Sequence, residues 1–96
     1  MWGVAMHEDA LFIQQIPDQN RYYLYARDTA QLRDAAIRIG VHKSKYDGRQ
    51  PFPHYVLTPR QSQTAVLYHG AIEVTPAQML VIVRGKRDIS QLEVIK

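Results

Sequence analysis

The spacing of apolar and polar residues predicts a first helix after Asp28. Apolar residues recur at helical spacing along one face of this segment: Leu32, Ala35, Ala36 and Ile39. Asp28 is suited to cap the helix, with Gln31 closing a capping box, and Gly40 supplies a left-handed end. We therefore expect a helix that ends at Gly40 and packs this face against the core.

Two further helices are predicted from a repeated start signal. The sequences Thr58-Pro59-Arg60-Gln61 and Thr75-Pro76-Ala77-Gln78 each place threonine at the cap, proline at the first helical position and glutamine at the third. The helices should run from about residue 59 to 69 and from about 76 to 84, each followed by glycine. Residues 79–83 are apolar throughout and also fit a buried strand, but the capping signal favours a helix.

Short apolar segments between these helices predict strands. We expect strands near residues 11–16 and 21–26, joined by a turn at 17–20, and two more at 55–57 and 72–74. The order β-β-α-β-α-β-α indicates a small α/β layer with a mixed, partly parallel sheet and about three helices. The chain of 96 residues makes one domain. Residues 1–10 are expected to form a loosely held lead-in, and residues 88–96 are a candidate edge strand.

Composition removes several classes of function. The chain has no cysteine, which excludes disulfides, thiolate catalysis and the usual structural zinc sites. Its longest apolar run, residues 79–83, is too short to cross a membrane, and the acidic start at Glu8 and Asp9 does not suit a secretory signal. We expect a cytoplasmic protein. Because so small a domain has a modest core, a homo-oligomer is a further expectation.

Positive charge is concentrated in residues 41–60. This stretch holds Lys43, Lys45, Arg49 and Arg60 against the single carboxylate of Asp47, so its net charge equals the +3 of the whole chain. A local positive field attracts phosphate groups or an acidic partner. A solvated basic surface loop explains the same charges.

The strand predicted at residues 55–57 runs directly into a helix start, where free backbone N–H groups favour anions. We therefore predict a phosphate site at this point, although no glycine-rich phosphate loop accompanies it. The candidate ligand-binding residues are Lys43, Lys45, Arg49, His54, Tyr55, Thr58 and Arg60. The ligand would be a nucleotide or a nucleic acid.

His54 supports two interpretations. As an imidazole beside Tyr55 it could act as a general acid or base. A buried histidine bonded to backbone is the commoner outcome, and we expect that structural role. The four histidines have no metal-ligand spacing, so we expect no metal, no cofactor and no catalytic residue.

The tyrosines of the second predicted strand also have two interpretations. Tyr22, Tyr23 and Tyr25 could form a stacking platform for bases. Tyrosine is equally typical of half-buried strands, which is the interpretation we favour.

Several segments occur in an order that resembles the DUF4031 family of small bacterial and phage proteins, whose function is unknown. They are Tyr23-Leu24-Tyr25-Ala26, Ile37-Arg38-Ile39-Gly40-Val41, His54-Tyr55 and Gly70-Ala71-Ile72-Glu73-Val74-Thr75. The resemblance covers roughly residues 21–84, supports the fold and draws attention to His54-Tyr55. It implies paired aspartates in the first strand and an acidic residue after His-Tyr. This chain has neither, since Val56 follows Tyr55.

These observations lead to two functional hypotheses. The first is a binding domain for a phosphate-bearing ligand, using the basic loop and a helix N-terminus. The second is a protein-interaction module with a tyrosine-rich face, such as a phage-encoded inhibitor of a host enzyme or defence system. Phosphate contacts weaken as salt rises, whereas an apolar interface hardly responds, so salt dependence separates the two. An enzyme is the third choice.

Overall fold

The computed structural model describes residues 10–49 and 52–85, and it confirms a small α/β domain with a mixed sheet. The elements follow in the order β1 (Leu11–Gln15), β2 (Tyr22–Ala26), α2 (Thr29–Ile39), the 3-10 helix η1 (Lys43–Lys45), β3 (Tyr46–Asp47), β4 (His54–Leu57), α3 (Pro59–His69), β5 (Ile72–Val74) and α4 (Pro76–Gly85). The described strands form one sheet in the order β3-β4-β2-β1-β5. Only β1 and β5 are paired in parallel, and the other pairs are antiparallel.

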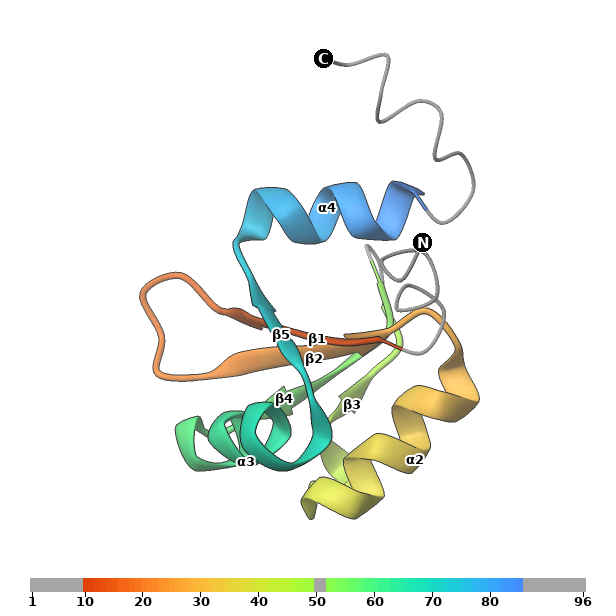
Figure 1. The fold of residues 1–96 in the computed structure, drawn as a ribbon, viewed down its shortest axis with the longest axis vertical. Coiled ribbons are helices and arrows are strands. Elements are labelled where there is room, and N and C mark those ends of the chain that lie inside the picture. Colours follow the sequence, from red (N-terminus) through yellow and green to blue (C-terminus); the bar gives the residue numbers. More distant parts are fainter. Residues whose placement is uncertain (1–9, 50–51, 86–96) are drawn as a thin grey trace.

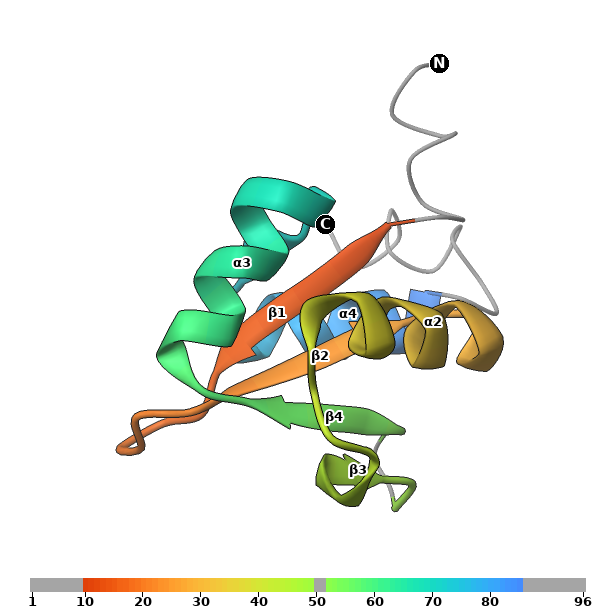
Figure 2. The same cartoon turned by 90° about the horizontal axis from the view of Figure 1, so that it is seen from below.

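Helices cover both faces of this sheet, as Figure 1 shows, with α4 on one side and α2 and α3 on the other. Seen from below in Figure 2, α2 and α3 lie in front of the sheet and α4 behind it. Alternate residues of each strand therefore point to different layers. Leu24 and Leu57 have no exposed surface and pack toward α2 and α3, where Leu32 is 1% exposed. This larger apolar cluster is the main core.

The second face carries a smaller, aromatic cluster beneath α4. Phe12, Tyr25 and Phe52 are buried there, and Met79 of α4 has no exposed surface. The Tyr25 and Phe52 rings meet edge to face at 5.3 Å between centroids. Burial raises the pKa of the Tyr25 phenol, an effect that the nearby positive charge of Arg27 partly offsets. The helix α4 thus completes the domain as a third layer.

The predicted caps are confirmed for the two proline-containing helices. At α3, Thr58 and Gln61 exchange side-chain to backbone hydrogen bonds of 3.0 and 3.1 Å. At α4, Thr75 and Gln78 do the same at 2.9 and 3.1 Å. Gly40 and Gly70 adopt φ of 92° and 70°, the left-handed conformation that ends α2 and α3. Residues 79–83 are therefore helical.

Three details differ from the sequence prediction or lie outside the described chain. A capping box would have the Asp28 carboxylate accept from the N–H of Gln31. It accepts instead from the N–H of Ala30, one residue earlier, at 2.9 Å. The basic loop contains η1 and β3, which the apolar pattern does not reveal because β3 has only two residues. The predicted edge strand at 88–96 and all but the last residue of the lead-in at 1–10 lie outside the described residues.

None of the helices in the described part of the chain is long and apolar enough to cross a membrane.

Candidate functional site

Strand β4 separates two of the predicted site residues. His54 and Tyr55 are adjacent, so their side chains point to opposite faces of the sheet. His54 packs on the α4 side against the rings of Tyr23 and Phe52, at 4.3 and 5.3 Å between centroids. Tyr55 lies on the α2 side, within the main core. The two residues cannot act on one ligand atom as neighbours.

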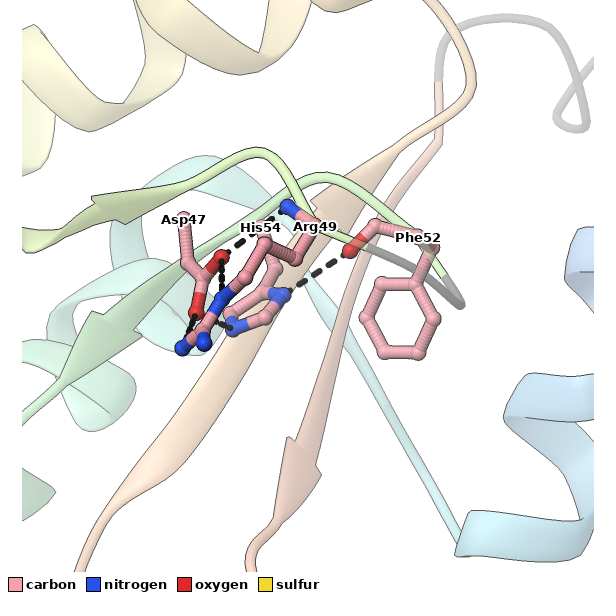
Figure 3. A network of polar contacts seen from close by, with 4 residues as sticks. All are labelled: Asp47, Arg49, Phe52 and His54. Atoms are coloured by element: carbon pink, nitrogen blue, oxygen red, sulfur yellow. Dashed lines mark hydrogen bonds and ion pairs between the residues drawn. The ribbon is translucent and has the colours of Figure 1, made fainter.

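The imidazole of His54 is held in one orientation. Its Nδ1 atom lies 2.9 Å from the carbonyl oxygen of Phe52, which can only accept, so Nδ1 donates. The predicted buried, backbone-bonded histidine is thereby confirmed, with 7% of the residue exposed. The other ring nitrogen, Nε2, lies 4.0 Å from Oδ2 of Asp47. Figure 3 shows this arrangement.

Asp47 and Arg49 form a tight pair beside His54. Arg49 donates from Nε to Oδ1 at 3.1 Å and from Nη2 to Oδ2 at 2.9 Å, and its backbone N–H donates to Oδ1 at 2.9 Å (Figure 3). These bonds from the side chain and backbone of Arg49 hold the pKa of the Asp47 carboxyl well below its usual value. The same pairing raises the pKa of Arg49. Both groups are therefore charged under ordinary conditions.

A hollow of about 610 Å³, here called the main hollow, lies on this face between the sheet and one side of α4. Its lining combines residues of β1, β2, β4 and α4 with the Asp47–Arg49 pair. Polar groups of the lining include Gln14, Asp47, Arg49 and His54. Tyr23 and Val56 add ring and aliphatic surface, and Met79 and Leu80 form the α4 wall. Such a mixed lining suits an organic ligand with a few polar groups.

Gln14 is the least expected member of this lining. It is 5% exposed, although glutamine is mostly a surface residue. Its Nε2 reaches the carbonyl oxygen of Gln15 only at 3.4 Å, and Oε1 accepts no hydrogen bond from a described residue. The amide oxygen is therefore available to accept a hydrogen bond from water or a ligand inside the hollow.

A second hollow adjoins the main one. This edge hollow, of about 460 Å³, shares Asp47, Arg49 and Val56 with the main hollow and adds Ser44, Lys45 and Tyr46. The two hollows therefore adjoin along these three shared residues, and together they are called the joined hollows. Lys45 and Arg49, both predicted ligand-binding residues, meet here, and Arg49 also reaches the lining that contains His54.

The other predicted residues fall elsewhere. Lys43 and Tyr55 line a hollow of about 410 Å³ on the α2 side, here called the back hollow, together with Arg33, Ala36, Ile37, Val41 and Tyr46. Thr58 and Arg60 line none of these three hollows. They follow the end of β4, whereas His54 begins it, so the strand separates them. The capping box also occupies the N–H groups of Thr58 and Gln61.

The sequence prediction placed the ligand where β4 runs into α3, because ligands often bind at the carboxyl ends of parallel strands. That rule does not apply at β4. Both neighbours of β4, β2 and β3, are antiparallel to it. Two residues of the lining, Gln14 and Asp47, were not predicted as site residues from the sequence. One signal in the sequence could have indicated Gln14. It is a polar residue in an apolar strand, two positions after Phe12 and therefore on the same buried face.

Within the described residues, no group of three or more His, Asp or Glu side chains is placed to hold a metal ion. The joined hollows offer hydrogen-bonding groups, ring surfaces and cations.

Comparisons with known proteins found no match: no protein-family model, curated protein or solved structure is significantly similar to this chain. The resemblance to the DUF4031 family stays a prediction. Val56, at the position where this resemblance would imply an acidic residue, lines both joined hollows with an apolar side chain.

Proposed function

We propose that this domain binds a phosphate-bearing small molecule, and that a nucleotide is the ligand class. One observation carries the proposal: the main and edge hollows are joined through Asp47, Arg49 and Val56. One end of the joined surface presents buried hydrogen-bonding groups, and the other presents exposed cations. A nucleotide has the same division, with a planar base that hydrogen-bonds and a phosphate that carries charge.

The base would lie in the main hollow. Gln14 offers an amide acceptor and a weakly used amide donor, and His54, whose Nδ1 is bonded to the Phe52 carbonyl oxygen, offers Nε2 as a further hydrogen-bonding atom. The Tyr23 ring, in contact with the imidazole at 4.3 Å, adds an aromatic surface. Ring contacts and a few fixed hydrogen bonds are how proteins hold bases.

The phosphate would lie at Lys45 and Arg49. Both side chains are exposed at the edge hollow, and the described carboxylate there, Asp47, is already bonded to Arg49. Lys45 supplies a positive charge without a carboxylate partner among the ion pairs of the described residues. Arg49 bonds Asp47 through Nε and Nη2, which leaves its other terminal nitrogen to donate to a phosphate oxygen.

Calorimetric titrations of adenosine, guanosine, cytidine and uridine against their 5′-monophosphates test the proposal in low salt. For at least one pair, the monophosphate should bind more tightly than the nucleoside, and added salt should remove the difference. Lys45→Gln should reduce the preference for the monophosphate. Arg21→Gln is the control, because Arg21 is also an exposed cation but lines none of the three hollows. Equal affinity for every nucleoside and its monophosphate contradicts the proposal.

A second candidate function is a protein-interaction module. The tyrosine-rich face predicted for it does not exist as one surface, so it would depend on another. Tyr25 is only 4% exposed, and Tyr22 points to the opposite face from Tyr23, so these tyrosines form no common surface. The observation in its favour is that Leu67 and Tyr68 of α3 are 72% and 77% exposed. A partner whose binding is insensitive to salt and is lost in the Leu67→Ser/Tyr68→Ser variant would support it.

A further inference from the structure

The back hollow also adjoins the joined hollows, at Tyr46 of β3. Tyr46 lines both the back hollow and the edge hollow, and the edge hollow shares three wall residues with the main one. Strand β3 is an edge of the described sheet. The three hollows therefore follow one another around that edge, from the face covered by α2 to the face covered by α4.

Each of the three hollows is lined by at least one cation. Arg33 and Lys43 line the back hollow, Lys45 lines the edge hollow, and Arg49 lines the edge and main hollows. Asp47 is the one carboxylate among the three linings, and Arg49 binds it through two side-chain contacts. Arg33 and Lys43 take part in none of the ion pairs found among the described residues. The path is thus positively charged beyond the single phosphate position proposed above.

Aromatic rings are interleaved with these cations. Tyr46, 42% exposed, lies against Tyr55 with ring centroids 5.2 Å apart, between Lys43 and Lys45 in the two hollows it lines. Tyr23 lies in the main hollow at the far end of the path. Exposed aromatic rings alternating with cations along a groove are typical of surfaces that bind single-stranded nucleic acid, because bases stack and phosphates pair with the charges.

We propose that the three hollows form one track for a short single strand of nucleic acid, which passes around β3. The inference rests on the proposed nucleotide site and extends it: one nucleotide occupies the main and edge hollows, and linked nucleotides continue past Tyr46 to Arg33 and Lys43. Stacking on rings does not discriminate strongly between bases, so sequence preference along the back hollow should be weak.

Binding of thymidine 5′-monophosphate is compared with binding of an oligothymidylate of about eight residues, a length within the range of single-strand sites. The oligomer should bind more tightly and with a steeper salt dependence. Each phosphate contact contributes about 0.7 to the slope of log affinity against log salt for single strands. Fluorescence anisotropy measures the labelled oligomer, and calorimetry measures the monophosphate.

Matched double variants test the path itself. Arg33→Gln/Lys43→Gln should lower the salt slope of the oligomer by about 1.4, as expected for two lost phosphate contacts, and leave the monophosphate unaffected. Arg21→Gln/Arg38→Gln removes the same charge from exposed arginines outside the three hollows and should change both ligands little. Tyr46→Leu should weaken the oligomer by about tenfold, in the range of base stacking, while Tyr46→Phe keeps the ring and the affinity.

The outcomes separate the two proposals. If the monophosphate binds and the oligomer binds no more tightly, the nucleotide site stands and the track is wrong. If both double variants weaken the oligomer equally, the effect is one of net charge and the track is also wrong. If wild type binds neither ligand, nor any other nucleotide, both proposals fail.

Discussion

The imidazole of His54 and the carboxylate of Asp47 face each other across two paired strands, with 4.0 Å between Nε2 and Oδ2. The register of β3 on β4 sets this relationship, because Asp47 and His54 are directly paired. Arg49 fixes the carboxylate and Phe52 fixes the imidazole. The wall of the main hollow therefore depends on a strand of only two residues and on the side chains that anchor it.

Replacing His54 with asparagine should lower the free energy of unfolding by roughly 1–3 kcal/mol, the cost of leaving a buried partner unpaired. The imidazole also fills space between Tyr23 and Phe52 that the smaller amide would leave empty. Chemical denaturation measures the change. His42→Asn is the control, because His42 is exposed and asparagine can also accept the capping hydrogen bond from Ser44 N–H, so the change there should stay within about 0.5 kcal/mol. Equal stability of both variants would contradict a structural role for His54.

The Asp47 carboxylate should make stability dependent on acid pH. Its pKa in the folded state lies below the ordinary value of 3.8, so the folded state favours the charged form. The carboxylate therefore contributes stability above that pH, and the contribution is lost as the pH falls below it. Denaturation of wild type and Asp47→Asn should show a stability difference at neutral pH that shrinks toward pH 3. A difference that stays constant between these pH values would exclude this linkage.

The two threonine caps should contribute similarly to stability. Thr58→Ala and Thr75→Ala each remove the acceptor of an observed capping box, at a cost of about 1 kcal/mol. Thr64→Ala is a useful comparison, because Thr64 is a mid-helix threonine whose hydroxyl donates to the Arg60 carbonyl oxygen. Its replacement should cost less, since alanine has the higher helix propensity. Losses below a few tenths of a kcal/mol at both caps would argue against these helix starts.

Met79→Ala should destabilise the domain by about 2–5 kcal/mol, because its fully buried side chain packs beneath α4 with Phe12, Tyr25 and Phe52. Leu80→Ala on the same helix is the control, since Leu80 is 43% exposed and should lose much less. A small effect of Met79→Ala would mean that α4 is not packed on this face in solution. The main hollow would then lack one of its walls.

The helices could be predicted because their signals are local. Thr58, Gln61, Thr75 and Gln78 cap helices through contacts three residues apart, and Gly40 ends α2 within one turn. The candidate site could be predicted only in part. Whether a residue reaches a hollow depends on strand register and on where α4 lies, and neither is encoded near the residue in sequence.

Two pairs of residues illustrate this limit. Thr58 and Arg60 were grouped with His54 because they are near it in sequence, yet the length of β4 separates them. Gln14 and Asp47 are far apart in sequence, yet they line the same hollow. Their strands, β1 and β3, belong to one sheet, and the side chains of β2 and β4 continue the lining between them. Sequence proximity indicated the basic character of the region, and the sheet order determined which cations share a surface.

The most direct test of the nucleotide proposal is a two-dimensional amide NMR titration of wild type with adenosine, guanosine, cytidine and uridine 5′-monophosphates in low salt. We predict that at least one of them shifts the Gln14 side-chain amide together with the backbone amides of Lys45 and Arg49. The backbone amides of Thr58 and Arg60 should hardly move. Shifts centred on Thr58 and Arg60 would place the phosphate at the start of α3 instead, and an unchanged spectrum with all four would contradict nucleotide binding.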